Sequence, residues 1–266
     1  MALELANLPC WDEPANLRRY ILSALGLGLP TLQLGTPNRE TLGLCAFGPS
    51  LVEFEDEIRN HEGPLWCVNG AHDWLISKDI APDACVLLDS TEALADVITP
   101  IAGVRYYVAS QCHPRLFDRL KGFDVVLWHA WVPKAQTIDD IRDLVTSNVP
   151  KGTECHFISG GGTAALRCFT LGKWVGYRKF IAWGLDSSFK DNRTHATPDY
   201  PCKGTWLDVE YAGRVFPTNG PLAAQADNFE GLMMWQLNGC RVDVRGDGLI
   251  PHICATINRL KYGEAA

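Results

Sequence analysis

The sequence predicts an α/β protein with a doubly wound, mostly parallel, Rossmann-like sheet and an N-terminal helical extension. Two observations favour this fold class. Short apolar runs of strand length alternate with segments of helical spacing, which is typical of parallel strands joined by right-handed crossovers. The chain also has 266 residues, of which 47% are hydrophobic, and this is enough for a sizeable core.

The first 40 residues differ from the rest of the chain. Residues 16–27 have the spacing of a helix, and Gly28-Leu29-Pro30 would end it. We therefore predict a helical extension over residues 1–40 and a Rossmann-like domain over residues 41–266.

The elements of that domain follow in order along the chain. The predicted strands are residues 42–47, 65–68, 84–88, 105–109, 125–129, 155–158, 179–183 and 241–244, and the predicted helices include 51–58, 114–120, 164–175 and 222–237. In such a fold, ligands bind beyond the carboxyl ends of the strands. The residues that directly follow each strand are therefore the candidate site residues.

Charge and cysteine content exclude several classes of protein. Lys and Arg total 24 against 31 Asp and Glu, so the net charge of −7 does not suit a nucleic-acid backbone or an anionic membrane. The most apolar stretch, residues 22–34, is broken by glycine and proline and is too short to span a bilayer. Ten cysteines without a C-x-x-C pair, and no secretory leader after Met1, predict a reduced, cytoplasmic protein.

A helix start follows the first predicted strand. Gly48-Pro49-Ser50-Leu51 is a turn, and Ser50 with Glu53 matches the S-x-x-E capping box. The N–H groups and the positive dipole end of such a helix favour phosphate binding by Gly48, Pro49 and Ser50. An ordinary, well-capped turn explains the same residues.

Polar residues also follow the second and third predicted strands. Asn69 can donate to and accept from a base or a ribose, although Asn69-Gly70 is equally a turn signal. Asp89 is placed to hold Mg²⁺ or a ribose, or it caps the next helix.

The strongest local signal is a run of three glycines between a predicted strand and a predicted helix. Ser159-Gly160-Gly161-Gly162-Thr163 lacks three successive side chains, so its N–H groups could approach phosphate oxygens closely, and Thr163 adds a hydroxyl. Close packing of the helix explains the glycines as well. We predict that this turn binds nucleotide phosphate.

Two further candidates lie beyond the strand at 179–183. Asp186 ends that strand and is predicted to act in catalysis and, together with Asp89, to bind metal. His195 follows in a polar loop and is the imidazole best suited to proton transfer or phosphate contact, although a lone loop histidine is usually only solvated.

Taken together, residues 42–253 resemble the family named for the archaeal 6-hydroxymethylpterin diphosphokinase MptE, whose larger relatives include motility accessory factors that modify flagellin. The matching residues are Gly48-Pro49-Ser50, Asn69, Asp89, the Ser159–Thr163 turn, Gly184-Leu185-Asp186 and His195. The segment 246–251 resembles phage-encoded members. The resemblance implies a Rossmann-like fold and diphosphoryl transfer from ATP to a hydroxymethylpterin-like acceptor, with Mg²⁺.

The same succession of residues is similar to bacterial sialyltransferases that use a CMP-sugar. Those enzymes have an asparagine before Gly-Pro-Ser that touches the nucleotide, whereas this chain has Phe47, preceded by Ala46 where a glycine is usual. The departure removes a polar contact and leaves the nucleotide preference open between ATP and a CMP-sugar.

Three functions follow as hypotheses. The first is Mg²⁺-dependent diphosphoryl transfer from ATP, and the second is glycosyl transfer from a CMP-sugar with His195 as base or phosphate partner. The third is nucleotide binding without turnover. The expected partners are a nucleotide and a small-molecule acceptor, with no nucleic acid and no membrane, and the sequence leaves open whether the chain forms a homo-oligomer.

Overall fold

The computed structural model describes residues 12–131, 139–197 and 205–263. By their contacts, the residues group into two compact units. Of the described residues, 37–65, 177–197 and 205–263 belong to unit 1, and 12–36, 66–131 and 139–176 belong to unit 2. Each unit is described by itself. The predicted boundary between residues 40 and 41 stays a prediction.

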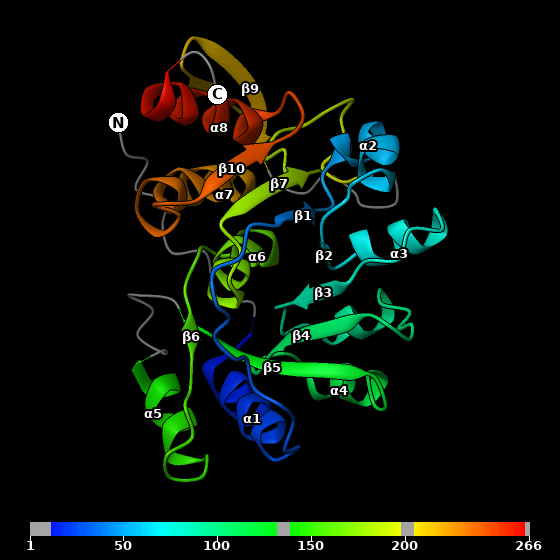
Figure 1. Cartoon of the computed structure of the whole chain (residues 1–266), viewed down its shortest axis with the longest axis vertical. Coiled ribbons are helices and arrows are strands. Elements are labelled where there is room, and N and C mark those ends of the chain that lie inside the picture. Colours follow the sequence, from blue (N-terminus) through cyan, green and yellow to red (C-terminus); the bar gives the residue numbers. More distant parts are fainter. Residues whose placement is uncertain (1–11, 132–138, 198–204, 264–266) are drawn as a thin grey trace. The chain divides into compact units, whose positions relative to one another are not determined.

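The strands of unit 2 are parallel and follow one another in the order of the sequence. They are β2 (Leu65–Val68), β3 (Ala84–Leu87), β4 (Arg105–Ala109), β5 (Asp124–Ala130) and β6 (Phe157–Ile158). Figure 1 shows β2 to β5 stacked in this succession. Because the strands are parallel, the residues that follow them lie at a common edge.

Helices flank these strands. They are α1 (Pro14–Leu25), α3 (Ala71–Ser77), the short 3₁₀ helix η2 (Glu92–Asp96), α4 (Pro114–Arg119), α5 (Asp139–Ser147) and α6 (Ala164–Val175). In Figure 1, α1 lies between α4 and α5, and Ile21 of α1 packs in one apolar cluster with Leu144 and Val145 of α5. Helix α6 is buried over most of its length.

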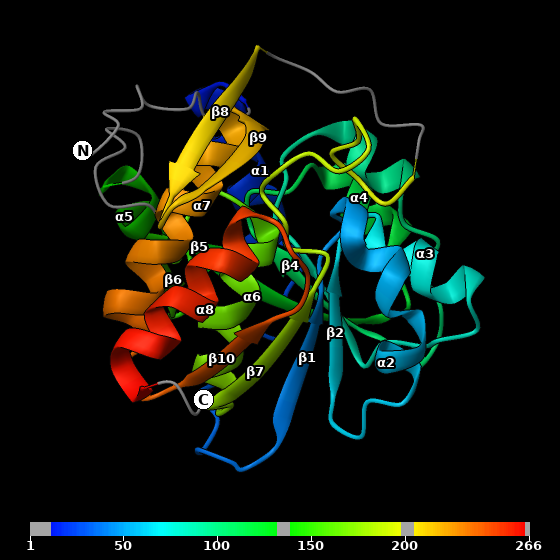
Figure 2. The same ribbon diagram turned by 90° about the horizontal axis from the view of Figure 1, so that it is seen from above.

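Unit 1 is built on three parallel strands and an antiparallel hairpin. The order β10 (Arg241–Val244), β7 (Lys179–Trp183), β1 (Thr41–Cys45) forms the parallel part. Its helical segments are η1 (Pro49–Phe54), α2 (Glu55–Arg59), α7 (Gly220–Gly231), the π-helical segment η3 (Leu232–Gln236) and α8 (Leu249–Tyr262). Strands β8 (Trp206–Tyr211) and β9 (Arg214–Asn219) form the hairpin, which Figure 2 shows beside α7 and α8.

The structure confirms the predicted α/β alternation. Each predicted strand is present, with bounds that differ by two residues or fewer, and α6 has the predicted bounds. The predicted helix at 222–237 is split between α7 and η3. The sequence reasoning missed α3, α5, α8 and the hairpin. The described cysteines other than Cys155 are buried, as expected for core residues, while Cys10 and Cys202 lie outside the described residues.

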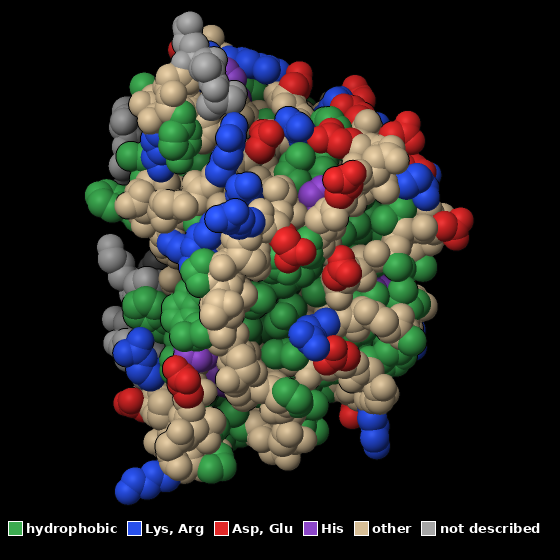
Figure 3. Space-filling model, in the orientation of Figure 1, with side chains coloured by type: hydrophobic (Ala, Val, Ile, Leu, Met, Phe, Trp, Pro, Cys, Tyr) green, Lys and Arg blue, Asp and Glu red, His purple; other side chains and the backbone are tan. Residues whose placement is uncertain are grey.

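Both signs of charge gather on the surface of unit 1. Figure 3 shows acidic side chains over α2, whose first turn carries Glu55, Asp56 and Glu57, and basic side chains over the start of β7 and β10. There the exposed Lys179 of β7 and Arg241 of β10 lie opposite each other in the register of the two parallel strands. Within the described ranges, no helix is both long and apolar enough to cross a membrane.

Candidate functional site

In unit 1, the turn after β1 is closed by contacts to the residues that follow β7. The N–H of Gly48 donates to the carbonyl of Gly184 at 2.6 Å, and the N–H of Ser50 donates to Oδ2 of Asp186 at 3.0 Å. The predicted capping box is wrong, because the helix begins at Pro49 with Gly48 as N-cap and no side-chain cap. Ser50 therefore lies inside the helix, where its N–H serves a carboxylate from a distant part of the chain.

Asp186 is enclosed by glycines on several sides. A Cβ on Gly48 would lie 2.4 Å from Oδ2 of Asp186, and a Cβ on Gly248 would lie 2.8 Å from its carbonyl oxygen. The residue is 4% exposed, and burial raises the pKa of its carboxyl, although the contacts with Ser50 act in the opposite direction. These glycines are thus required by the close approach of Asp186.

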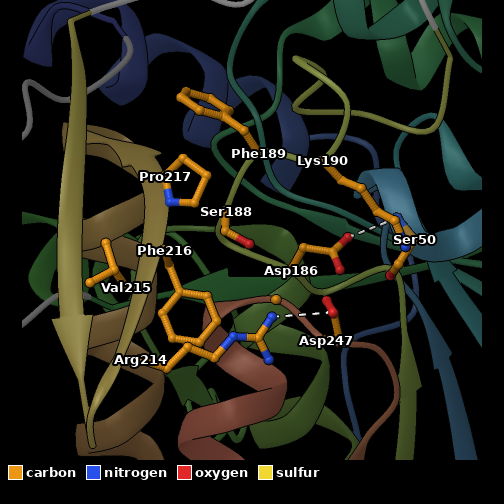
Figure 4. A pocket seen from close by; sticks show the side chains of 11 residues that line it. Ser50, Asp186, Ser188, Phe189, Lys190, Arg214, Val215, Phe216, Pro217 and Asp247 are labelled. Atoms are coloured by element: carbon orange, nitrogen blue, oxygen red, sulfur yellow. Dashed lines mark hydrogen bonds and ion pairs between the residues drawn. The ribbon is translucent and has the colours of Figure 1, made fainter.

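A cavity of about 80 Å³ opens beside Asp186 (Figure 4). It is lined by Ser50, Asp186, Ser188, Phe189, Lys190, Arg214, Val215, Phe216, Pro217, Asp247 and Gly248. Arg214 pairs with Asp247 at 3.2 Å, and Lys190 pairs with Glu53. The cavity therefore combines a buried carboxyl, two hydroxyls, two cations that are already paired, and an aromatic wall.

Phe216, one of the two aromatic residues that line the cavity, lies on strand β9, which sequence reasoning did not predict. Phe216 and Pro217 lie on this strand, and Arg214 begins it. Two signals were present. Residues 206–211 and 214–219 flank a two-residue turn, Ala212-Gly213, and both turn residues have positive φ, at 48° and 80°. A glycine in such a turn between two strand-sized segments is a hairpin signal.

His195 lies in the loop after β7 and contacts Phe47, two residues beyond the end of β1. Its ring is 5.9 Å from the ring of Phe47, and the adjacent N–H of Ala196 donates to the carbonyl of Phe47 at 3.0 Å. The hydroxyl of Thr194 lies 2.8 Å from Nδ1 of the histidine. Burial lowers the pKa of His195, so its imidazole is neutral at neutral pH. Phe47 thus packs on the candidate histidine.

In unit 2, the structure brings Asn69 and Asp89 together. Asn69 has a φ of 42°, a left-handed conformation that asparagine tolerates, and its Nδ2 donates to Oδ2 of Asp89 at 2.9 Å. Oδ1 of the asparagine is buried and has no hydrogen-bond partner in the described structure. Burial raises the pKa of Asp89, while Asn69 lowers it. Within the described ranges, no three His, Cys, Asp or Glu side chains form a metal-binding group.

The Ser159–Thr163 turn joins β6 to α6. Gly160 and Gly161 have positive φ, at 133° and 90°, and the hydroxyl of Thr163 accepts from the N–H of Leu166 as the N-cap. A Cβ on Gly160 would lie 2.5 Å from Oγ1 of Thr170, whereas one on Gly162 would meet no described atom within 4 Å. Conformation and packing therefore account for the first two glycines, and the third faces open space.

The same turn is held by a buried arginine that sequence reasoning missed. Arg167 of α6 is 2% exposed, and its Nε donates to the carbonyl of Gly161 at 2.7 Å. Its Nη1 donates to the carbonyls of Trp131, at 2.8 Å, and Ile158. The signal was an arginine among the apolar residues of a predicted core helix.

The predicted site residues therefore form groups within each unit. Gly48, Ser50 and Asp186 meet in unit 1, where Phe47 and His195 form a second contact. Asn69 meets Asp89 in unit 2, which also contains the glycine turn. That all of them form one site stays a prediction.

Comparisons with known proteins identify a family and a similar fold. A family model described as 6-hydroxymethylpterin diphosphokinase MptE-like matches residues 30–192. No protein of the curated collection matches the chain. Among solved structures, the MAf glycosyltransferase from Magnetospirillum magneticum AMB-1 is similar with a TM-score of 0.65 and 16% sequence identity, over 88% of this chain. This chain covers 37% of that protein's length. At this identity the likeness shows the fold alone, which is Rossmann-like.

Proposed function

The chain belongs to the MptE-like family, and from this premise we propose that it is a nucleotide-dependent transferase. The reaction that we favour is diphosphoryl transfer from ATP to a hydroxymethylpterin-like acceptor. The acceptor hydroxyl loses its proton and attacks the β-phosphorus of ATP, the bond from that phosphorus to the α-phosphate oxygen breaks, and AMP leaves. The family description and the glycine turn of unit 2 support this reaction.

One observation carries the proposal. The N–H groups of Gly160, Gly161 and Gly162 donate to no backbone carbonyl of the described residues, and they precede the first turn of α6, a helix of 12 residues. N–H groups at a helix N-terminus favour phosphate oxygens, and the dipole of the helix adds a partial positive charge. Ser159 and Thr163 flank these glycines with hydroxyls. The turn therefore has the donors that a transferred phosphate chain needs.

Mg²⁺ fits best near Asn69 and Asp89. Mg²⁺ prefers oxygen ligands and is commonly held by one or two carboxylates together with substrate phosphates. Asp89 supplies a carboxylate, and the buried Oδ1 of Asn69 has no other partner among the described residues. When bound, the ion would neutralise charge on the phosphates. The predicted role of Asp186 as a second metal ligand stays a prediction.

Asp186 and His195 are the proposed catalytic residues. Burial raises the pKa of the Asp186 carboxyl, so it holds a proton more readily than an exposed carboxyl, and it lowers the pKa of His195, so its imidazole is neutral and has a lone pair that can accept a proton. Either group would accept the proton of the acceptor hydroxyl as the phosphorus–oxygen bond forms.

Glycosyl transfer from a CMP-sugar is the second candidate. It is favoured by His195, which is neutral at neutral pH and can act as a base, and by the fold shared with a protein named as a glycosyltransferase. In this reaction the acceptor hydroxyl would lose its proton to His195 and attack the sugar, and CMP would leave. No metal ion is required.

A nucleotide panel distinguishes the two reactions. We would incubate the chain with ATP, GTP, CTP or CMP-sugar, with pterin and sugar acceptors, and with or without EDTA. Diphosphoryl transfer predicts AMP formation that EDTA abolishes and that Asp89→Asn reduces. Glycosyl transfer predicts CMP formation that EDTA leaves unchanged and that His195→Ala reduces. Nucleotide binding without any turnover would contradict both and leave the non-catalytic hypothesis.

A further inference from the structure

A buried positive charge lies at the glycine turn of unit 2. Burial lowers the pKa of Arg167 to about 10, so the guanidinium still carries its charge at neutral pH. All its hydrogen-bond acceptors in the described residues are backbone carbonyls, and none is a carboxylate. An uncompensated buried charge is strongly unfavourable.

These hydrogen bonds also orient the turn. In a planar trans peptide, the carbonyl and the N–H of the following residue point in opposite directions. The carbonyl of Gly161 points toward Arg167, so the N–H of Gly162 points away from Arg167. Gly162 is also the glycine at which an added Cβ would meet open space. Arg167 therefore fixes the direction of this donor before any ligand binds, which lowers the entropic cost of binding.

The three carbonyl acceptors carry only partial negative charge, so no full negative charge of the described residues faces the guanidinium. A glutamine side chain also donates to carbonyls but carries no charge, so the charge and the hydrogen bonds can be tested separately. Moreover, Nη2 of Arg167 makes no hydrogen bond to the described residues. An anion at the turn would offset this charge, which no carboxylate of the described residues contacts.

We propose that Arg167 is a positioning residue that makes the Ser159–Thr163 turn specific for a multiply charged phosphate chain, such as a diphosphate group, over a neutral or singly charged ligand. The inference rests on the proposed function, since it assigns a ligand class to the same turn. Arg167 supplies long-range attraction and orients the Gly162 N–H, which makes the contact. The affinity of the turn should therefore rise with the charge of the ligand.

Calorimetry with inorganic pyrophosphate, inorganic phosphate and adenosine tests this inference without requiring turnover. We would compare the wild type with Arg167→Lys, which keeps the charge, and Arg167→Gln, which keeps hydrogen-bond donors. Arg105→Gln is the matched control, because Arg105 is an exposed arginine of the same unit that pairs with Asp124. Circular dichroism checks the fold of each variant.

We expect pyrophosphate to bind about tenfold or more tightly than phosphate, and Arg167→Gln to weaken it by about tenfold or more. Arg167→Lys should keep most of the preference for pyrophosphate, and Arg105→Gln should keep all of it. Pyrophosphate affinity in the wild type should fall as NaCl rises. Equal losses in the Lys and Gln variants, or a wild type that does not rank ligands by charge, would overturn the inference.

Turnover separates this inference from the proposed function. Charge-ranked binding that depends on Arg167, in a chain that transfers nothing, supports the inference and contradicts the transferase. Turnover with nucleotide affinity unchanged in Arg167→Gln overturns the inference and leaves the transferase intact. A wild type that binds neither pyrophosphate nor a nucleotide overturns both.

Discussion

The turns after β1 and after β6 occupy the same place between a strand and a helix, but the charges that contact them are opposite. Both follow a parallel strand, contain glycine and lead into a helix. In the turn after β1, the N–H groups of Gly48 and Ser50 are occupied by the carbonyl of Gly184 and the carboxylate of Asp186. In the turn after β6, the side chain that contacts the turn is the cation Arg167, which donates hydrogen bonds to backbone carbonyls.

The difference shows that a glycine-rich strand-to-helix turn is not by itself a phosphate site. At the turn after β1, the protein supplies its own anion, and the glycine is required because Asp186 approaches closely. At the turn after β6, the side chain that contacts the turn is a cation and it bonds to carbonyls, so the N–H groups of the turn remain available to an anion. What a turn can bind depends on which charge the rest of the fold places against it.

The comparison yields predictions about stability, which follow from the largest expected loss to the smallest. The largest concerns Gly48→Ala. Its Cβ would lie 2.4 Å from the carbonyl oxygen of Gly184 and 2.4 Å from Oδ2 of Asp186. Because the first of these is a backbone atom, the strand ends must separate, and we expect a loss of about 3 kcal/mol or more in the free energy of unfolding. Urea denaturation measures it.

A matched control is Gly220→Ala, at the start of α7, where a Cβ meets no described atom within 4 Å. It should change the unfolding midpoint little. A Gly48→Ala variant as stable as this control would contradict the close packing of Asp186.

Gly160→Ala should cause the second largest loss. The position combines a φ of 133° with a Cβ 2.5 Å from Oγ1 of Thr170, whose hydroxyl donates to the carbonyl of Ser159 at 2.6 Å. Strain of this kind costs about 1–3 kcal/mol. The clash is with a side chain, so the loss should be smaller than for Gly48→Ala. Thr170→Val, which removes only the hydroxyl, tests the hydrogen bond alone, and about 1 kcal/mol is expected.

The sequence predicted those features of the fold that local residues determine. Helix α6 was predicted with its observed bounds, because Thr163 caps it and its apolar residues are close in sequence. The capping box at Ser50 was wrong because Asp186, 136 residues away, takes the N–H instead. No local pattern contains that contact.

The candidate site was predicted only in part for a similar reason. The pairs Asn69 with Asp89, and Ser50 with Asp186, could be expected because parallel strands bring their carboxyl ends to one edge. The contact of Arg167 with three carbonyls depends on the depth at which α6 packs, which its apolar periodicity does not reveal. The aromatic wall from β9 depends on how the hairpin folds back, which is a tertiary feature.

Asp186→Asn tests the effect of the carboxyl charge at the turn after β1. Burial raises the pKa of Asp186 above its ordinary value of 3.8, so the folded state holds the proton to a higher pH than the unfolded state. The stability from this group is present below the ordinary pKa and is lost as the pH rises through the folded pKa. The wild type should therefore lose this contribution progressively as the pH rises from about 4.

The asparagine does not titrate and can still accept the N–H of Ser50. Its variant should gain stability relative to the wild type as the pH rises from about 4, and at neutral pH it should be at least as stable as the wild type. Asp124→Asn, at an exposed carboxylate, is the control. A variant that loses stability relative to the wild type as the pH rises would mean that the carboxylate is stabilised in the fold. Turnover, in contrast, should fall about 100-fold or more if Asp186 exchanges the acceptor proton.

Little change in stability is expected for Gly162→Val, although ligand binding should weaken. Gly162 lacks positive φ, and an added Cβ meets no described atom within 4 Å, so we expect a change within about 0.5 kcal/mol. The two methyl groups would occupy the space beside the N–H groups of the turn, and pyrophosphate should bind about tenfold or more weakly. Gly161→Val is a poorer test, because its φ of 90° strains a β-branched residue and confounds folding with binding. Calorimetry and urea denaturation on one preparation decide the case: a stable Gly162→Val variant with unchanged pyrophosphate affinity would mean that the open side of this turn is not where the phosphate binds.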